Sequence, residues 1–317
     1  MRIAIVLLLA TLLAACSGAK KQAELLEQTK PAWLKERPVN PDYYYGIGIT
    51  SKVGSPTFYE DKAKDRALAD ISSQINSTIK SEAMFYQVED KQGVHEYLQN
   101  RIKSTSAQYL EGYEYIEKWE DLSNVYVYYR LSKQKYKEVK AQRKSEAIKL
   151  ALEDYVGGVE LQEHGRHIAA IEHYAKAIDA LSGYLNESTT AEVKGKVVNL
   201  ALESSKRINE IIHSFRISSN TQNLSADNFF LINDDKQVTV TNCPVRLKYS
   251  GGYLVQDKIK TDDRGRLAMP NLPTSNGGKH TLRVSIDLVS LGRQVTRNLY
   301  VRKIIEQQKA AEIVVGK

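Results

Sequence analysis

The chain has 317 residues and a formal net charge of +7, carried by 45 lysine and arginine residues against 38 aspartate and glutamate residues. This excess of positive charge is small and spread along the sequence, which argues against a nucleic-acid-binding protein with a dedicated basic face. With only two cysteines, Cys16 and Cys243, the sequence predicts no internal disulfide framework, so a buried core must hold the fold together.

The first residues resemble the signal peptide of a bacterial lipoprotein. Arg2 precedes an apolar run over residues 3–13, which is too short to cross a bilayer as a helix. The run ends in Leu-Ala-Ala-Cys, which resembles a lipobox, because small residues precede a thiol that accepts the lipid. The resemblance implies removal of residues 1–15 and a diacylglycerol group on Cys16 Sγ. An ordinary secretory signal with an incidental cysteine is the alternative.

The predicted lipidation of Cys16 and the residue that follows it indicate the cellular location of the protein. Several acyl chains on Cys16 hold a protein stably on a membrane, whereas one chain does not. Ser17 follows the cysteine in place of an aspartate, a pattern that resembles lipoproteins sorted to the outer membrane. We therefore expect the periplasmic face of the outer membrane, with residues 16–30 as a polar tether between the lipid and the first domain.

A folded α+β domain is predicted over residues 31–133. One helix is expected to begin at Thr57 and to carry an apolar residue at every fourth position. A second helix is expected over residues 95–109. Its strands are expected at 43–49, 113–119 and 125–131. The last strand alternates apolar and polar side chains, as a strand with one buried face does. Helices on one side of an antiparallel sheet are therefore expected.

Gly46 and Gly48 form a Gly-Ile-Gly sequence in the first expected strand. A dinucleotide-binding fingerprint needs a third glycine, but Ser51 stands at that position, and no helix begins directly afterwards to bind a phosphate. The two glycines therefore predict a sheet position where the backbone is tightly packed, and no cofactor is expected.

The same stretch resembles a known lipoprotein family. The sequence YYYGIGIT follows Pro31 and Trp33 and precedes the alanine-rich stretch AKDRALADISSQINSTIKSE. This combination is similar to the Helicobacter-type Lpp-twenty lipoprotein family. Its relatives include flagellar outer-membrane assembly lipoproteins and the N-terminal domain of a flagellar basal-body ring protein. The resemblance covers about residues 31–135 and implies a small α+β domain at the outer membrane with no assigned catalytic residue.

A helical domain is predicted over residues 134–215. The basic helix at 133–149 either lies on anionic headgroups or is a solvated connecting helix. Small and aromatic residues then stand at the spacing of one tetratricopeptide repeat: Gly158, Leu161, Gly165, Ala170, Tyr174 and Ala177. One repeat cannot bury its own face, so helices over 134–156 and 189–214 are expected to close it. These residues predict packing between helices, and peptide binding in the groove is the alternative.

Residues 216–317 are predicted to form an all-β sandwich. Alternating strands and turns with Gly or Asp resemble bacterial immunoglobulin-like or carboxypeptidase-regulatory-like domains, which are spacer and adhesion modules. The strand expected at 238–247 contains Cys243, which should be buried. The polar segment 216–228 is expected to be the exposed joint between the helical and C-terminal domains.

The sequence offers no residue for catalysis. His164, His167 and His173 form the one histidine cluster, but the last two stand six residues apart on opposite sides of a helix, so no metal site is expected. No nucleophile elbow and no phosphate loop occur in the sequence. We therefore predict no catalytic residue, no cofactor, no nucleic-acid partner and no small-molecule ligand.

The function predicted from these patterns is that of a non-enzymatic outer-membrane lipoprotein. It would act as an envelope scaffold or assembly factor through contacts with other envelope proteins. The alternative is a protein that binds peptidoglycan or another glycan, or an accessory subunit of an enzyme. For glycan binding, Tyr126, Tyr128 and Tyr129 would stack on sugar rings.

Overall fold

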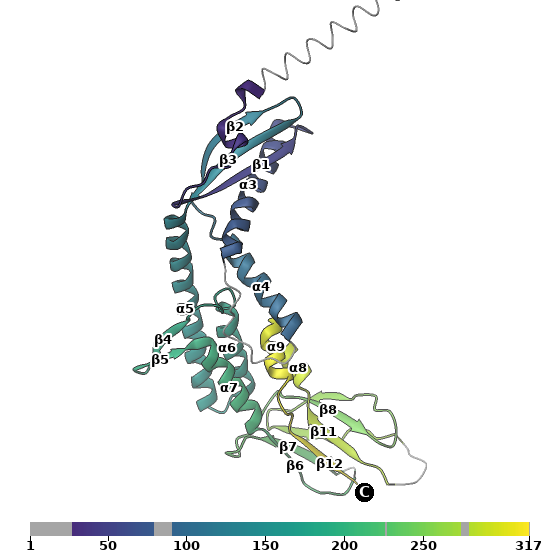
Figure 1. Ribbon diagram of the computed structural model, residues 1–317. Coiled ribbons are helices and arrows are strands. Elements are labelled where there is room, and N and C mark those ends of the chain that lie inside the picture. The colour runs from purple at the N-terminus through teal and green to yellow at the C-terminus, as the bar shows by residue number, and fades with distance from the viewer. Residues whose placement is uncertain (1–26, 79–90, 226, 274–278, 317) are drawn as a thin grey trace, which may run out of the picture. The chain divides into compact units, whose positions relative to one another are not determined.

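The computed structural model describes residues 27–78, 91–225, 227–273 and 279–316 (Figure 1). The predicted signal peptide, Cys16 and most of the tether lie outside these ranges. Helices and antiparallel sheets both occur, so the predicted α+β class is confirmed. Over the described residues, no helix combines the length and the apolar character needed to span a bilayer.

The chain divides into two compact units. Unit 1 comprises Met1–Ile79 and Ser106–Lys140, and unit 2 comprises Lys80–Thr105 and Ala141–Lys317. Each unit has its own buried side chains and is described by itself below.

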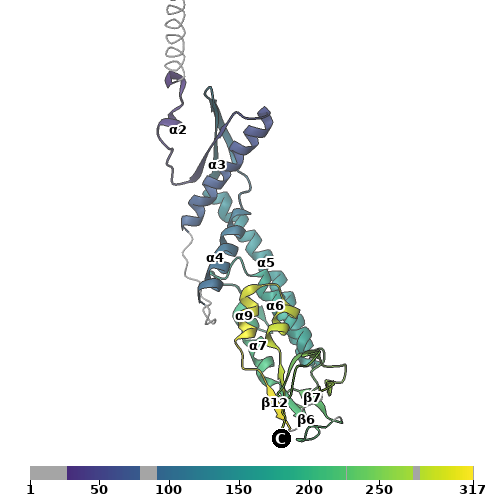
Figure 2. The same cartoon turned by 90° about the vertical axis from the view of Figure 1, so that its right-hand side faces the viewer.

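Unit 1 is built from a helix packed on a three-stranded antiparallel sheet. Its elements are α2 (Ala32–Lys35), β1 (Tyr43–Ser51), α3 (Pro56–Thr78), β2 (Glu114–Glu120) and β3 (Asn124–Ser132). The strand order is β1-β3-β2, and α3 packs against β1 and β3. Figure 2 shows α3 lying along the sheet.

Two glycines of β1 let α3 lie directly on the sheet. A side-chain carbon at Gly46 would overlap the backbone oxygen of Ala67, and one at Gly48 would overlap that of Ala63. Both alanines are fully buried against the apolar side chains of β3. The prediction of a tightly packed backbone at this sequence is therefore confirmed.

Helix α3 begins one residue before the predicted start at Thr57. Pro56 is its first residue, and the Oγ of Ser55 accepts a hydrogen bond from the backbone N–H of Phe58 (3.4 Å). Proline is favoured at the first helical position because its fixed φ suits the helix and it has no N–H to leave unpaired. The cap is therefore Ser55.

Unit 2 joins helices to two sheets. Its helices are α4 (Lys91–Ala107) up to residue 105, α5 (Lys133–Glu163) from residue 141, α6 (His167–Ala180), α7 (Leu200–Ser214), α8 (Leu288–Val295) and α9 (Leu299–Glu306). Its strands are β4 (Thr190–Val193), β5 (Lys196–Asn199), β6 (Arg216–Ser219), β7 (Phe229–Asn233), β8 (Pro244–Tyr249), β9 (Lys258–Lys260), β10 (Arg266–Ala268), β11 (Leu282–Ile286) and β12 (Glu312–Val315). Strands β4 and β5 form a hairpin, and the others form sheets of order β10-β7-β6 and β12-β11-β8-β9.

The helices and sheets of unit 2 share one hydrophobic core. The predicted separation of a helical domain at 134–215 from a C-terminal domain at 216–317 is therefore wrong. Core side chains come from both regions, including Ile171 in α6, Ile208 in α7, Phe230 in β7 and Tyr300 in α9. Helices α8 and α9 also pack against α6 and α7. A sequence pattern shows which face of an element is apolar, but not which other face covers it.

The C-terminal region is not all-β as predicted, because α8 and α9 lie between β11 and β12. The side chain of Asp287 accepts a hydrogen bond from the N–H of Ser290 (3.1 Å) and caps α8. Leu288, Leu291 and Val295 then fall on one buried face of that helix. The segment is therefore a strand only as far as the end of β11 at Ile286.

Two other predicted boundaries are wrong. The joint expected at 216–228 begins with β6, which pairs with β7 and so belongs to a sheet. The helix expected at 95–109 in the first domain is α4, and its Val94 and Leu98 lie in the core of unit 2. An amphipathic stripe predicts a buried face without indicating which core buries it.

Cys243 lies directly before β8, so the strand expected over 238–247 begins only at Pro244 and does not contain the cysteine. Cys243 is fully buried, as predicted. Burial raises the pKa of its thiol to about 12, so the thiol is protonated at neutral pH. The residue therefore packs as a small apolar side chain.

Candidate functional site

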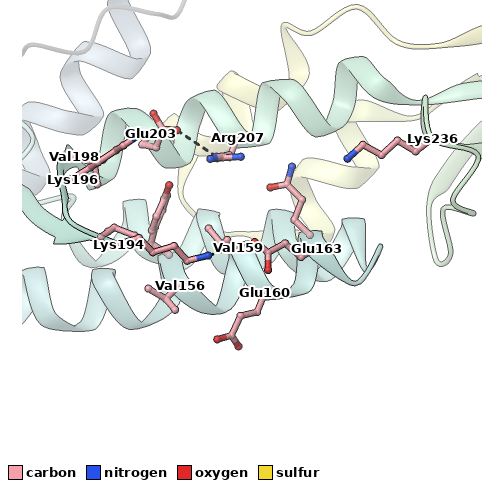
Figure 3. A pocket seen from close by; sticks show the side chains of 13 residues that line it. Val156, Val159, Glu160, Glu163, Lys194, Lys196, Val198, Glu203, Arg207 and Lys236 are labelled. Atoms are coloured by element: carbon pink, nitrogen blue, oxygen red, sulfur yellow. Dashed lines mark ion pairs between the residues drawn. The ribbon is translucent and has the colours of Figure 1, made fainter.

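A groove of about 780 Å³ lies between helices α5 and α7 of unit 2 (Figure 3). The β4–β5 hairpin lies at one end of the groove, and Lys236, in the turn after β7, lies at the other. Valine and charged side chains together form most of its lining. The groove is therefore assembled from segments that are distant in the sequence.

The turn between α5 and α6 reverses the chain behind the groove. Gly165 has a φ of 71°, a left-handed conformation that glycine adopts without strain. Its N–H donates to the carbonyl oxygen of Gln162 (3.0 Å), and the N–H of Arg166 donates to that of Leu161 (2.8 Å). These bonds satisfy the last carbonyl groups of α5 and let α6 return along it.

Helix α6 packs closely on α5 at a glycine of α5 that faces an aromatic ring of α6. A side-chain carbon at Gly158 would lie 2.8 Å from the ring of Tyr174, so the glycine leaves room for that ring. Tyr174 is fully buried, and its ring centroid lies 5.7 Å from that of Tyr155. The structure places the residues of the predicted repeat in this contact, in its turn or in the neighbouring core: Gly158, Leu161, Gly165, Ala170, Tyr174 and Ala177. The groove itself is lined by other residues.

The β4–β5 hairpin occupies residues where part of a helix over 189–214 was predicted, and that part of the prediction is wrong. Val193 pairs with Lys196 across a two-residue turn, in which Lys194 and Gly195 have φ angles of 49° and 78°. Positive φ at both turn residues matches the twist of a two-stranded hairpin. The glycine of the Lys-Gly pair, with β-branched residues on either side, is the signal that identifies it.

Helix α7 begins directly after the hairpin and brings two opposite charges to the groove. The side chain of Asn199 accepts a hydrogen bond from the N–H of Leu202 (3.1 Å) and caps the helix. Glu203 and Arg207 follow one turn apart, with Arg207 Nε 3.4 Å from Glu203 Oε1. Figure 3 shows the Arg207 guanidinium between the two helices.

Two of the four basic side chains that line the groove form no ion pair with any residue that the structure describes. Lys194 Nζ lies 3.6 Å from Glu163 Oε1. Lys196 and Lys236 form no ion pair with any residue in the described ranges, and they stand at opposite ends of the groove (Figure 3). Four valines also line the groove, and one of them, Val156, is 37% exposed. The groove therefore offers an apolar strip with an unpaired ammonium group at each end.

The three histidines considered for a metal site lie apart from one another. Nε2 of the buried His167 lies 3.2 Å from Asp234 Oδ2, and burial lowers the pKa of His167 although the carboxylate opposes this effect. His173 Nδ1 lies 3.1 Å from Asp154 Oδ1, and His164 bonds to the last turn of α5. Among the residues that the structure describes, no group of three or more His, Cys, Asp or Glu side chains could hold a metal ion.

The three tyrosines considered for sugar stacking do not share one face of the unit 1 sheet. Tyr128 is buried beneath Trp33, and their ring centroids lie 5.2 Å apart. The hydroxyl of Tyr126 donates to Asp121 Oδ2 (2.9 Å). Tyr129 points to the other face, where it packs against the core under α3. They therefore do not form a single stacking platform.

Comparison with known proteins does not show to which family the chain belongs, so its family stays a prediction. No protein-family model matches the chain, and neither the curated proteins nor the solved structures contain a match. The resemblance to the Lpp-twenty lipoprotein family rests on the residues quoted above. The groove and the lipobox-like sequence before Cys16 are therefore the features of the chain that bear on its function.

Proposed function

We propose that the protein is a lipid-anchored, non-enzymatic scaffold at the periplasmic face of the outer membrane. It holds a segment of another envelope protein in the groove between α5 and α7. The resemblance of the sequence before Cys16 to a lipobox supports the anchor. The groove, with its apolar strip and unpaired lysines, is the observation that carries the proposed contact.

The lining of the groove favours a polypeptide over a small molecule. Seven of its thirteen lining residues are charged, four basic and three acidic. Small-molecule pockets are lined mainly by apolar and aromatic side chains with few polar groups. A mixture of charged and apolar side chains is instead what an amphipathic protein segment meets when it lies between two helices.

The occupant that we propose is an amphipathic helical segment with one apolar face and a carboxylate near each end. Its apolar face would cover the four valines, and its carboxylates would pair with Lys196 and Lys236. Charges at the rim of such a contact set orientation and partner choice more than affinity. The segment would therefore bind in one direction along the groove.

Site-specific crosslinking in intact cells tests this contact. A photo-crosslinking amino acid replaces Val156, which lines the groove and is 37% exposed. The matched control replaces Leu150, another exposed aliphatic residue of α5 that lies outside the groove. We expect the position of Val156, and not that of Leu150, to give an adduct with one envelope protein.

Charge reversal at the rim decides whether the adduct reflects binding in the groove. Lys196→Glu together with Lys236→Glu should reduce the Val156 adduct strongly, because the glutamate carboxylates that replace both ammonium groups then repel the carboxylates of the segment. The proposal is wrong if the two crosslinking positions give the same adducts, or if charge reversal leaves the Val156 adduct unchanged.

A further inference from the structure

A second groove lies in the C-terminal part of unit 2, beside two sheet edges. Strand β9 ends the four-stranded sheet, and β10 ends the three-stranded sheet. Residues of both strands line this groove, which measures about 620 Å³. In Figure 1 the labelled strands β8 and β7 mark the sheets to which β9 and β10 belong. In the described ranges, no further strand of either sheet covers these edges.

The backbone of β9 leaves two residues free to pair with another strand. The N–H of Leu247 donates to the carbonyl oxygen of Asp257 (2.7 Å), and the N–H of Thr261 donates to that of Cys243 (3.0 Å). Hydrogen-bonded residues alternate along an antiparallel strand, so the backbone groups of Lys258 and Lys260 point away from β8. Such an unpaired edge is a ready template for an incoming strand.

The side chains of β9 alternate between charged and apolar. Lys258 and Lys260 are exposed, whereas Ile259 between them is half-buried and lines the groove with Leu267 and Met269. A strand that paired with β9 would place its own side chains alternately beside the lysines and over the apolar side chains that line the groove. Its sequence should therefore alternate acidic and apolar residues.

Charge around this edge favours an acidic partner and disfavours a second copy of β9. Lys258 Nζ lies 4.0 Å from Asp287 Oδ2, whereas Lys260 forms no ion pair with any described residue. The guanidinium of Arg266 lies over the ring of Phe229. The one acidic side chain of the lining, Asp262, accepts hydrogen bonds from the backbone N–H groups of Arg264 and Arg266 (both 2.8 Å). Two antiparallel copies of β9 would set lysine against lysine, which destabilises the pairing of strands.

We propose that β9 binds an extended segment of a partner protein, in which acidic and apolar residues alternate, as a fifth strand of its sheet. This site is separate from the groove between α5 and α7 and does not depend on the function proposed for it.

Synthetic peptides and the full-length protein in detergent test the proposal. The first probe is a fluorescent peptide of Glu-Val repeats, and the second is its Lys-Val counterpart. The third is the Glu-Val peptide with N-methyl groups on alternate residues, which removes the backbone donors on one edge. Fluorescence anisotropy measures binding, and hydrogen exchange followed by NMR measures protection of the backbone amides of Lys258 and Lys260.

We expect the Glu-Val peptide to bind and to slow exchange of both amides. Lys258→Glu with Lys260→Glu should weaken binding about tenfold or more, since two attractive charge pairs become repulsive. The control is Lys149→Glu on α5, an exposed lysine that lines neither groove, which should leave the affinity unchanged. Lys258→Gln with Lys260→Gln should give an intermediate affinity, and circular dichroism checks that each variant is folded.

Several results would overturn the proposal. Equal binding of the Lys-Val or N-methylated peptide would mean that neither charge nor backbone pairing selects the partner. Binding without protection of the Lys258 and Lys260 amides would place the peptide elsewhere. A loss of binding in Lys196→Glu, with none in the variants of β9, would place it in the groove between α5 and α7.

Discussion

Gly48 is the residue at which one added methyl group tests how closely α3 lies on the sheet of unit 1. Its Cβ would overlap the backbone oxygen of Ala63, which cannot move unless the helix moves. We expect Gly48→Ala to lower the free energy of unfolding of unit 1 by about 1–3 kcal/mol, as overpacking does. Chemical denaturation followed by tryptophan fluorescence measures this change, because Trp33 and Trp119 both belong to unit 1.

Gly292→Ala in α8 is the control for adding a methyl group. The nearest atom would lie 3.6 Å from the new carbon, an ordinary contact, and alanine favours a helix more than glycine does. We expect unchanged or slightly higher stability, measured by circular dichroism. If Gly48→Ala were as stable as the wild type, the helix could not be lying directly on β1.

His167 makes the stability of unit 2 depend on pH. Burial lowers its pKa below the ordinary value of 6.5, so the unfolded chain takes up a proton at a higher pH than the folded one. The contribution of the neutral imidazole is therefore complete above about pH 6.5 and is lost as the pH falls toward the pKa of the folded state. We expect the free energy of unfolding to decrease as the pH falls below about 6.5.

Urea denaturation at a series of pH values measures this effect. His167→Gln should show a flatter dependence on pH over the same interval, because glutamine has no group that titrates there. Asp287 and Asp121 do not interfere, since their pKa values are lowered and they titrate at more acidic pH. Identical slopes for the wild type and His167→Gln would contradict this role for the buried imidazole.

The contact between helices α9 and α6 depends on Asn298. Its Oδ1 accepts hydrogen bonds from the N–H groups of Tyr300 and Val301 (3.0 and 3.3 Å), and its Nδ2 donates to Asp179 Oδ1 (2.8 Å). Asn298→Ala removes both the helix cap and the bridge to α6. We expect it to lower the free energy of unfolding by about 2–3 kcal/mol.

Urea unfolding followed by circular dichroism measures the loss. Asn271→Ala is the control, because Asn271 is exposed and caps no helix, so its replacement should change stability by less than about 0.5 kcal/mol. A cost for Asn298→Ala no greater than that of the control would show that the bridge to Asp179 does not hold α9 in place.

The elements that the sequence predicted well are those whose signal is local. The alternation in β3 and the two glycines of β1 follow from the pleat and from close packing, and both can be read within about ten residues. Helix α8 was missed because eight residues that begin at Leu288 resemble a continuing strand unless the cap at Asp287 is recognised.

The candidate groove was not predictable in the same way. Gly158 and Tyr174 follow a repeat spacing, and they meet where α6 packs on α5. Lys196 and Lys236 lie forty residues apart, on a hairpin and on a turn between strands, and only the shared core of unit 2 brings them to one groove. Local periodicity carries no information on such long-range placement.

At the scale of the whole molecule, a chain that ends at Phe215 tests whether the helices and sheets of unit 2 form one core. Removing residues 216–317 would expose the apolar faces of α6 and α7 that α8, α9 and the sheets cover. We expect residues 141–215 to become sensitive to protease, in contrast to the full chain under the same conditions. Survival of a protected helical fragment would instead support the separate domain at 134–215.

The most direct test of a lipid-anchored scaffold is the distribution of the chain and of its Val156 crosslinked adduct among membrane fractions. The wild-type chain and the adduct should both float with the outer membrane. With Cys16→Ala, the chain should leave that fraction and the adduct should be lost from it, since no acyl chain remains to hold the protein on the membrane. A Cys16→Ala chain that still floats with the outer membrane, and still carries the adduct there, would contradict the account.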